Sequence, residues 1–406
     1  MQVVRSGLCT GCGACAAICP VRCIELVDIV DDGTRPEVDR HRCVKCGRCV
    51  RVCPGIRLSH SKWPDEIITQ LICEWGPIFE VWEGYASDPH IRYEGSSGGV
   101  ATALAAFCLE KGGFSGVLQI GPDRESPLQN VPVISRSRDE LTRNVGSRYA
   151  PAPTCAGLGS LLAEEGRFVV VGKPCDIAAT RKAQLVEERL RSRVGLALSI
   201  FCAGTPSTAG TYAVLDRLGV HPEDLKEIRY RGKGWPGNLS VTSHKGNRVY
   251  EMDYDKAWGH ILSRFTQPRC QLCPDSTGEF ADVACGDAWH RHVDTAQPGL
   301  SLILVRTELG RTVLKQAVKE GYITLQKAEP IVLRLAQRSL LGRRKELWGR
   351  LMVLRALGKM VPCYEGFALS ALWKDVPLRR RARLILGTWS SLVFKDVVRK
   401  KRVAQC

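Results

Sequence analysis

Two copies of one cysteine pattern lie near the start of the chain and limit how this part can fold. CTGCGACAAICP (residues 9–20) and CVKCGRCVRVCP (residues 43–54) both read Cys-x2-Cys-x2-Cys-x3-Cys-Pro. Three closely spaced thiolates can bind three irons of one [4Fe–4S] cubane, whereas the fourth cysteine is directed to the other cluster. The spacing therefore predicts two clusters with crossed ligand sets: Cys9, Cys12, Cys15 and Cys53 for the first, and Cys43, Cys46, Cys49 and Cys19 for the second.

Zinc is the alternative occupant of these cysteines. Zinc ribbons use two Cys-x-x-Cys pairs and have no need of four cysteines in each run. The doubled motif instead resembles bacterial two-cluster ferredoxins over residues 1–60. Between the motifs, IELVDI (residues 24–29) and RPEVD (residues 35–39) flank the turn DDGT and predict a short hairpin. Because such a module only carries electrons, we expect the chemistry to lie downstream.

The cysteine count bears on the compartment. The chain has 406 residues and 19 cysteines, and the odd total argues against a complete set of disulfides. In a reducing compartment, clustered cysteines are more often metal ligands or catalytic groups. No apolar run is long enough to span a bilayer, and the first residues lack a secretory segment. We therefore expect a cytoplasmic protein.

From about residue 75 to residue 321, short apolar runs alternate with helical patterns. This alternation predicts an α/β domain with a mainly parallel sheet, whose ligands bind beyond the carboxyl ends of the strands. The expected strands are 116–120, 167–172, 194–202 and 300–306, and the expected helices are 99–112, 175–185 and 207–219.

A serine- and glycine-rich loop, EGSSGGV (residues 94–100), runs directly into one of these helices. Amides and hydroxyls before a helix N-terminus can bind an anion, typically a phosphate. The loop matches neither the G-x-G-x-x-G fingerprint nor the P-loop, which weakens a nicotinamide-type Rossmann interpretation. The simpler alternative is an ordinary helix-start loop.

Two cysteines follow successive predicted strands. Cys175 opens the helix in VGKPCDIAA, and Cys202 ends the strand in IFCAGTPS. A thiolate at a helix N-terminus is stabilised there, which suits a nucleophile or a metal ligand; a buried structural cysteine is the alternative. Parallel strands would bring both to one sheet edge. Cys270 and Cys273 could then complete four thiolates, enough for a third cubane.

The whole set of segments resembles the beta-subunit family of coenzyme F420-reducing hydrogenases and F420H2 dehydrogenases. The matching segments, in that family's order, are SSGGVATAL, GSRYAP, VGKPCDIAA, FCAGTPS, RYRGKGWPG and RCQLCPD…ADVACGDAW. They cover roughly residues 75–325. The resemblance implies an FAD-containing domain with its own [4Fe–4S] cluster, and coenzyme F420 is the family's best-known substrate.

The resemblance also implies cofactor-binding residues. FAD contacts fall on Ser96, Ser97, Gly98, Gly99, Arg148 and Tyr149. Contacts with flavin or substrate fall on Lys173, Arg231, Lys233 and Trp235. No general acid or base is assigned, because the cofactor carries the difficult chemistry.

The remaining candidates are expected to be structural. Asp282 and Asp287 resemble turn and capping residues, and His290 and His292 suggest a solvated loop rather than a metal site. Cys23 is predicted to be a small buried residue, Cys73, Cys108 and Cys155 are predicted to lie in the core, and Cys285 is predicted not to be a ligand.

The C-terminal segment is strongly basic. Residues 331–406 contain 18 Lys and Arg against 4 Asp and Glu, an excess of 14 in a chain of net charge +16. Residues 377–402 alternate cationic blocks with apolar residues, as interfacial amphipathic helices do. The candidate partners are an anionic lipid surface, an acidic ferredoxin or redox subunit, and a polyanionic substrate; a helix packed on the domain is equally compatible. Nucleic acid is disfavoured because no recognition motif accompanies the charge.

These observations predict an α+β and α/β protein in three parts. They are a two-cluster ferredoxin fold (1–60), an α/β domain binding FAD and a third cluster (61–330), and a basic helical tail (331–406). The predicted function is an oxidoreductase that couples one-electron transfer through [4Fe–4S] clusters to hydride transfer with coenzyme F420 or another small organic molecule. The alternatives are a non-catalytic electron-transfer subunit, a reductase in pigment or polysaccharide biosynthesis, and, least favoured, a zinc-stabilised interaction protein.

Overall fold

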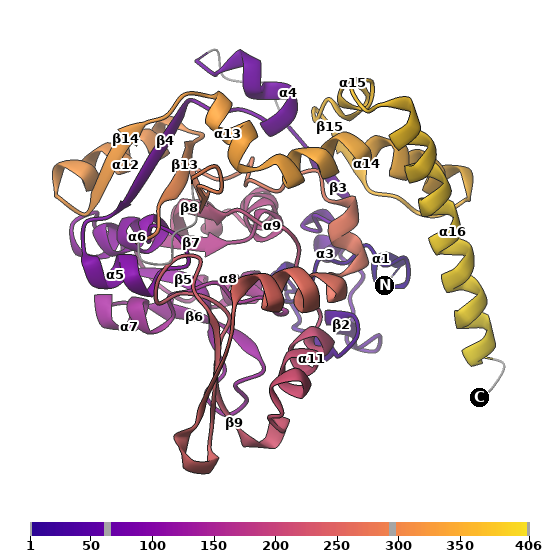
Figure 1. Cartoon of the computed structure of the whole chain (residues 1–406), viewed down its shortest axis with the longest axis horizontal. Helices are drawn as coiled ribbons and strands as arrows, with labels where there is room; N and C mark the ends of the chain where they lie inside the picture. Colours follow the sequence, from indigo (N-terminus) through magenta and orange to yellow (C-terminus); the bar gives the residue numbers. More distant parts are fainter. Residues whose placement is uncertain (1, 61–65, 292–297, 404–406) are drawn as a thin grey trace.

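The computed structural model describes residues 2–60, 66–291 and 298–403, with side chains as far as residue 390. A large mixed sheet forms the centre, the N-terminal module packs beside it, and the C-terminal helices run along the same side of the molecule (Figure 1).

The N-terminal module consists of short elements around the cysteine loops. They are α1 (Gln2–Arg5), α2 (Ala14–Ala17), β1 (Ile24–Ile29), β2 (Gly33–Val38), α3 (Arg48–Arg51) and β3 (Arg57–Ser59). β1 and β2 pair antiparallel, as the sequence predicts. Gly13, with φ 86°, begins α2 in the left-handed region, and an added Cβ would meet Ala156 N at 2.8 Å. The first cluster loop therefore packs directly on the central domain.

The central sheet has eight strands in the order β14-β4-β13-β12-β8-β7-β5-β6. Its strands are β4 (Glu80–Ala86), β5 (Gly116–Pro122), β6 (Asn130–Ser135), β7 (Phe168–Gly172), β8 (Val194–Ile200), β12 (Val283–Asp287), β13 (Ser301–Val305) and β14 (Ile323–Lys327). β5, β7, β8 and β12 are parallel, which confirms the prediction for the centre of the sheet. The flanking strands pair antiparallel. For β5 and β6 the reason is the connection, because residues 123–129 are long enough for a hairpin and too short for a crossover.

Helices cover both faces of the sheet, so the central strands are apolar along their whole length. On one face α6 (Val100–Glu110) and α12 (Glu308–Lys319) pack on the sheet, and on the other α8 (Leu158–Leu161) and α9 (Pro174–Val186) do so. The other helices of this part are α4 (Ile72–Trp75), α5 (Pro89–Glu94), α7 (Arg138–Arg143), α10 (Arg189–Arg193) and α11 (Thr208–Leu218).

A small antiparallel sheet projects from the body (Figure 1). It contains β9 (Leu225–Arg229), β10 (Leu239–Ser243) and β11 (Val249–Met252), and it shares an apolar core with α11. A π-helical turn at Asp255–Ile261 and short 3-10 turns, the last at Pro268–Leu272, lead from it to β12. This subdomain was not predicted.

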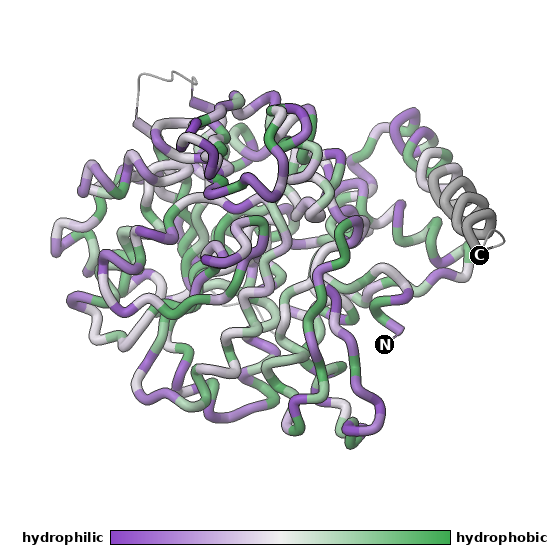
Figure 2. Tube along the Cα trace, turned by 90° about the horizontal axis from the view of Figure 1, so that it is seen from below, coloured by the Kyte–Doolittle hydropathy of each residue, from purple (hydrophilic) through white to green (hydrophobic). Residues whose placement is uncertain are grey.

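The C-terminal segment is more than a tail. It contains α13 (Ile331–Ala336), α14 (Arg338–Ala356), β15 (Cys363–Glu365), α15 (Leu369–Trp373) and α16 (Leu378–Val403). β15 pairs in parallel with β3, which ties this segment to the N-terminal module. α16 packs on α14 at its start and then extends away from the body (Figure 1). The hydropathy-coloured view shows polar and apolar residues alternating along the chain (Figure 2). Within the described ranges, no helix combines the length and the apolar character that a bilayer-spanning segment needs.

Candidate functional site

The first predicted cluster site is a cavity of about 290 Å³ in the N-terminal module. Cys9, Cys12, Cys15 and Cys53 line it together, although Cys53 belongs to the second motif. Gly11 N donates to Cys9 Sγ at 3.4 Å, an amide–sulfur contact of the kind that surrounds clusters. Burial, and then the neighbouring thiols, raise the pKa of Cys53 to about 12. The fold thus brings together the crossed ligand set that the spacing predicts.

The second site lies nearer to solvent. Cys46 is exposed, whereas Cys19, Cys43 and Cys49 are half-buried. Cys23 is buried as expected, and its sulfur lies 3.5 Å from that of Cys19. The second site therefore has a fifth thiol next to its predicted ligands.

A third cavity gathers the four cysteines predicted to hold another cluster. Cys175 from α9, Cys202 after β8, and Cys270 and Cys273 around the turn at Pro268–Leu272 line it, together with Thr10 of the first cluster loop. Burial raises the pKa of Cys202 to about 11 and that of Cys273 to about 12, so these thiols need a cationic partner to ionise at neutral pH.

The four thiols of the third site can be compared with the ligand geometry that a single zinc ion requires. Among the described residues, no three His, Cys, Asp or Glu side chains converge on one point as a single metal ion requires. A cubane places each thiolate on a separate iron and so tolerates wider separation. The four thiols that line this cavity fit a cluster, and Thr205 N, 3.4 Å from Cys270 Sγ, provides a donor to sulfur.

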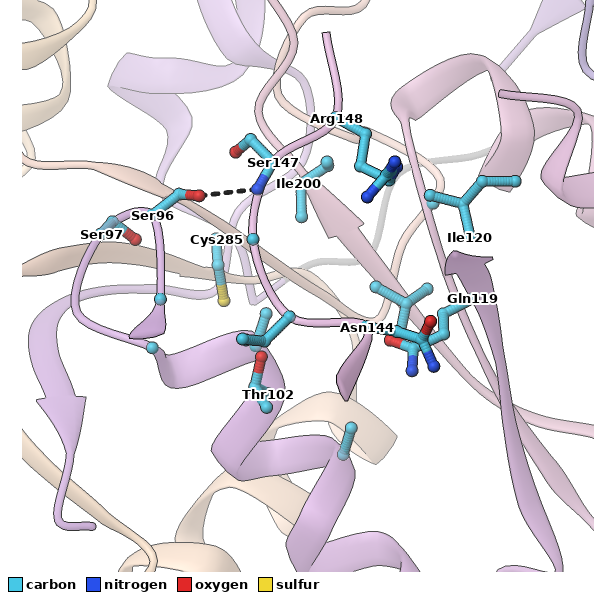
Figure 3. A pocket seen from close by; sticks show the side chains of 18 of the residues that line it. Ser96, Ser97, Thr102, Gln119, Ile120, Asn144, Ser147, Arg148, Ile200 and Cys285 are labelled. Carbon is cyan, nitrogen blue, oxygen red and sulfur yellow. Dashed lines mark hydrogen bonds between the residues drawn. The ribbon is translucent and has the colours of Figure 1, made fainter. Parts of the chain in front are cut away.

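A cleft opens at the carboxyl ends of the four parallel strands, where α/β sheets bind ligands (Figure 3). Ile120, Gly172, Ile200 and Cys285 line it, one from the end of each strand. Burial raises the pKa of Cys285 to about 12.

The serine- and glycine-rich loop forms one wall of this cleft. Ser96, Ser97 and Gly99 line it at the start of α6, and Ser96 Oγ accepts from Ser147 N at 2.7 Å (Figure 3). Gly98 does not line it: its N–H donates to Ser301 Oγ at 2.9 Å, and an added Cβ would meet Gly84 O at 2.6 Å. Gly98 thus serves close packing on the sheet.

Two cations face the cleft opposite this loop. Arg148 lines it, and burial lowers the pKa of its guanidinium. Burial also acts to lower the pKa of Lys173, but the Asp176 carboxylate, 2.7 Å from Lys173 Nζ, raises it overall. Both side chains are positive at neutral pH, so the cleft suits an anionic ligand.

An inner cavity of about 370 Å³ connects the cleft with the third cysteine site. Arg148 and Lys173 line both the cleft and the inner cavity, and Cys202 lines both the inner cavity and the cysteine site. The other walls are largely aromatic or come from the start of α14: Tyr149, Tyr254, Trp258, Trp289, Gln337, Ser339 and Leu340.

Arg231 is fixed in the wall of the inner cavity by Asp287, for which the sequence predicts only a turn or capping role. Arg231 is 2% exposed, and its guanidinium donates to both oxygens of Asp287 at 2.9 and 2.7 Å. Trp235 Nε1 donates to the same carboxylate at 2.8 Å, and its ring stacks on Trp289. Lys233 is exposed and does not line either cavity. The predicted turn role of Asp287 is wrong, because Asp287 ends β12 as the counterion of a buried arginine.

Two further expectations fail. His290 is half-buried, with Nε2 2.9 Å from a Glu83 oxygen, so it does not lie in a solvated loop; His292 lies outside the described residues. Cys73 is exposed on α4, whereas Cys108 and Cys155 are fully buried as predicted. Because α4 has only four residues and lies at the surface, the side chain of Cys73 is not buried in a core.

Comparison with known proteins agrees with this arrangement. Residues 8–55 match the 4Fe-4S dicluster domain, residues 81–158 the N-terminal part of the coenzyme F420 hydrogenase/dehydrogenase beta subunit, and residues 165–331 its C-terminal part. The chain is 26% identical over 263 residues to coenzyme F420 hydrogenase subunit beta of Methanothermobacter thermautotrophicus, covering 63% of this chain and 87% of that protein.

Two other comparisons extend the match. Coenzyme F420-dependent sulfite reductase of Methanocaldococcus jannaschii is 26% identical over 81% of this chain and 49% of its own length. The F420-reducing [NiFe] hydrogenase complex from Methanosarcina barkeri contains a chain of similar fold, with a TM-score of 0.55 and 21% identity over 71% of this chain and 97% of that one.

The fold and the cysteine sites define an iron–sulfur oxidoreductase with a ferredoxin-like electron-transfer domain. The chain belongs to the coenzyme F420 hydrogenase/dehydrogenase beta-subunit family.

Proposed function

We propose that the cleft binds FAD and that the protein couples hydride exchange with a small organic molecule to one-electron transfer through three [4Fe–4S] clusters. The observation that carries this proposal is the continuity of the sites: the cleft shares Arg148 and Lys173 with the inner cavity, which shares Cys202 with the third cysteine site. A bound flavin supplies both hydride and single-electron chemistry.

The residues of the cleft have defined tasks in this proposal. The α6 N-terminus, Ser96 and Ser97 bind phosphate, because amides and hydroxyls at a helix start favour anions. Arg148 and Lys173 supply positive charge beside them. Asp287 holds Arg231 in the wall of the inner cavity, so the guanidinium needs no reorganisation when a ligand enters.

We propose reduced coenzyme F420 as the organic substrate. Tyr254, Trp258 and Trp289 give the inner cavity aromatic walls that suit a planar ring, and Arg231 provides a cation near them. The relatives named above carry coenzyme F420 in their names, which supports this choice over other small molecules.

The test is anaerobic purification followed by flavin extraction and an assay of reduced coenzyme F420 with an artificial electron acceptor. We expect about one FAD per chain, loss of most of it in Arg148→Ala, and retention in Arg217→Ala, whose side chain is exposed on α11. If no flavin binds under any condition, the protein is an electron-transfer subunit. If flavin binds but coenzyme F420 is not oxidised, the substrate assignment is wrong.

We also propose that α16 contacts the inner face of an anionic membrane from the cytoplasm. The exposed residues Leu378, Ile385, Leu386 and Trp389 recur at helical spacing along one side of it, with Arg379 and Arg383 beside them. Such stripes bind the interface of anionic bilayers.

Sedimentation with phosphatidylglycerol vesicles tests the membrane contact. Leu386→Asp should weaken binding, whereas Leu185→Asp, at a similarly exposed leucine on α9, should not. Equal binding by both variants would contradict a role for the stripe.

A further inference from the structure

The three cysteine sites differ in their access to solvent. In the first site Cys9 and Cys12 are 8% and 7% exposed and Cys15 and Cys53 are half-buried. The four cysteines of the third site are also half-buried, and Thr10 lines both of these cavities. Cys46 of the second site is exposed, and Cys49 of that site reaches the cavity of the first. An external one-electron partner can therefore approach closest at the second site.

The surface around Cys46 has an apolar centre. Val44 is 59% exposed and Val50 is 54% exposed, on either side of Cys46 in the same loop and the following helix. Two exposed valines beside a solvent-accessible cluster ligand form a small contact area that protein docking would remove from water. We name residues 40–51 around this centre the outer cluster face.

The rim of the outer cluster face is basic. Arg40, Arg42, Lys45 and Arg51 are exposed there. Two acidic residues lie beside these cations: Asp39 accepts the backbone N–H groups of residues 41 and 42, and Glu187, which follows α9, pairs with Arg48 at 2.7 Å. Within the part of the chain that the structure describes, no carboxylate forms an ion pair with Arg40, Lys45 or Arg51. These charges are free to meet a negative partner.

The charge decides between the candidate occupants of this face. A second copy of the chain would bring the same positive rim, and like charges facing each other at an interface oppose association. An acidic protein would complement the rim, and its approach would be accelerated by the field of the basic residues.

We propose that the outer cluster face is the docking site of an acidic one-electron carrier protein. This inference rests on the proposed redox function. With a cluster held by Cys43, Cys46, Cys49 and Cys19, each docking event would pass one electron between the carrier and that cluster, so that one would be oxidised as the other is reduced. A hydride carries two electrons, so two docking events balance the conversion of one substrate molecule.

The test measures association of the cluster-loaded protein with an acidic [2Fe–2S] ferredoxin. In Lys45→Glu/Arg51→Glu, we expect the dissociation constant to rise and the second-order electron-transfer rate constant to fall by about tenfold or more. The wild-type rate should also fall steeply as salt rises, because salt screens exposed charges. The control Lys315→Glu/Lys319→Glu makes the same charge change at exposed positions of α12 and should keep wild-type values.

Further readouts separate this proposal from the proposed function. Iron content, flavin content and turnover with a small artificial acceptor should be unchanged in Lys45→Glu/Arg51→Glu. If binding of the ferredoxin is unaffected by this variant, the docking site is elsewhere and the inference is overturned. It is equally overturned if the variant loses only its binding to anionic vesicles. If docking depends on these charges but coenzyme F420 is not turned over, the docking site is supported and the substrate assignment is wrong.

Discussion

At the scale of single residues, the start of α6 depends on a glycine in the left-handed region. Gly99 has φ 76°, and an added Cβ would lie 2.8 Å from Ile91 O. Gly113 has a similar φ of 69° with open space around it. We predict that Gly113→Ala loses about 1–2 kcal/mol of unfolding free energy from backbone strain. Gly99→Ala should lose more than that and bind FAD about tenfold more weakly, because the loop must move.

Urea unfolding and flavin titration of both variants check this prediction. Equal flavin affinity in the two variants would show that the loop before α6 does not position the cofactor.

Asp287 is the second residue with a sharp expected effect. Asp287→Asn leaves the buried guanidinium of Arg231 without its counter-charge, and removing one partner of a buried ion pair costs about 3–5 kcal/mol. We predict a loss of this size in the free energy of unfolding, measured by urea denaturation. Asp216→Asn, at an exposed position of α11, should change it by less than about 0.5 kcal/mol. A similar small loss in both variants would contradict the role assigned to Asp287.

The sequence predicts some of these residues and not others for a physical reason. Cluster cysteines lie within a dozen residues of each other, so their spacing alone indicates their chemistry. Arg231 and Asp287 are 56 positions apart and meet only because the loop after β9 folds over the end of β12. Nothing local in the sequence distinguishes Asp287 from a capping residue.

At the scale of elements, long apolar runs made the central strands predictable. β7 and β8 are buried on both faces, so their sequences are continuously apolar. β9, β10 and β11 are short, partly exposed strands with weak alternation, and their pairing depends on contacts with α11. The antiparallel flanks of the large sheet depend on long-range pairing, which local patterns do not report.

Two of the four proposed ligands of the third cluster, Cys175 and Cys202, follow the ends of β7 and β8. We predict that Cys175→Ala, at the start of α9, lowers iron and acid-labile sulfide by about four atoms each per chain, because one cubane is lost. Cys285→Ala, at a buried cysteine of β12 lining the neighbouring cleft, should leave both contents unchanged. Iron and sulfide analysis after anaerobic purification checks this. A wild-type iron content in Cys175→Ala would remove Cys175 from the ligand set.

At the scale of the whole molecule, the C-terminal segment joins parts that the sequence suggested were successive domains. β15 pairs with β3, and Arg344 of α14 contacts the buried carboxylate of Glu279 beside the third cysteine site. Burial acts to raise the pKa of Glu279, but Arg344 and His60 outweigh it and lower this pKa to about 2. The C-terminal segment that begins near residue 331 therefore packs against both preceding parts of the chain, although the sequence predicts it as a separate part.

Iron removal should reveal how unequally these parts are stabilised. The N-terminal module has about 60 residues, four-residue helices and a hairpin of two six-residue strands. Modules of that size have marginal cores unless a metal or disulfide stabilises them. The central sheet instead has continuous apolar cores on both faces. We predict that oxidative removal of iron followed by chelation exposes the amides of residues 24–38 to hydrogen exchange while β5, β7 and β8 stay protected. Mass spectrometry of exchanged peptides measures both regions in one sample, so the sheet serves as the internal control. Unchanged protection in the β1–β2 hairpin would show that the contact of Gly13 with Ala156 and the pairing of β3 with β15 hold the module without its clusters.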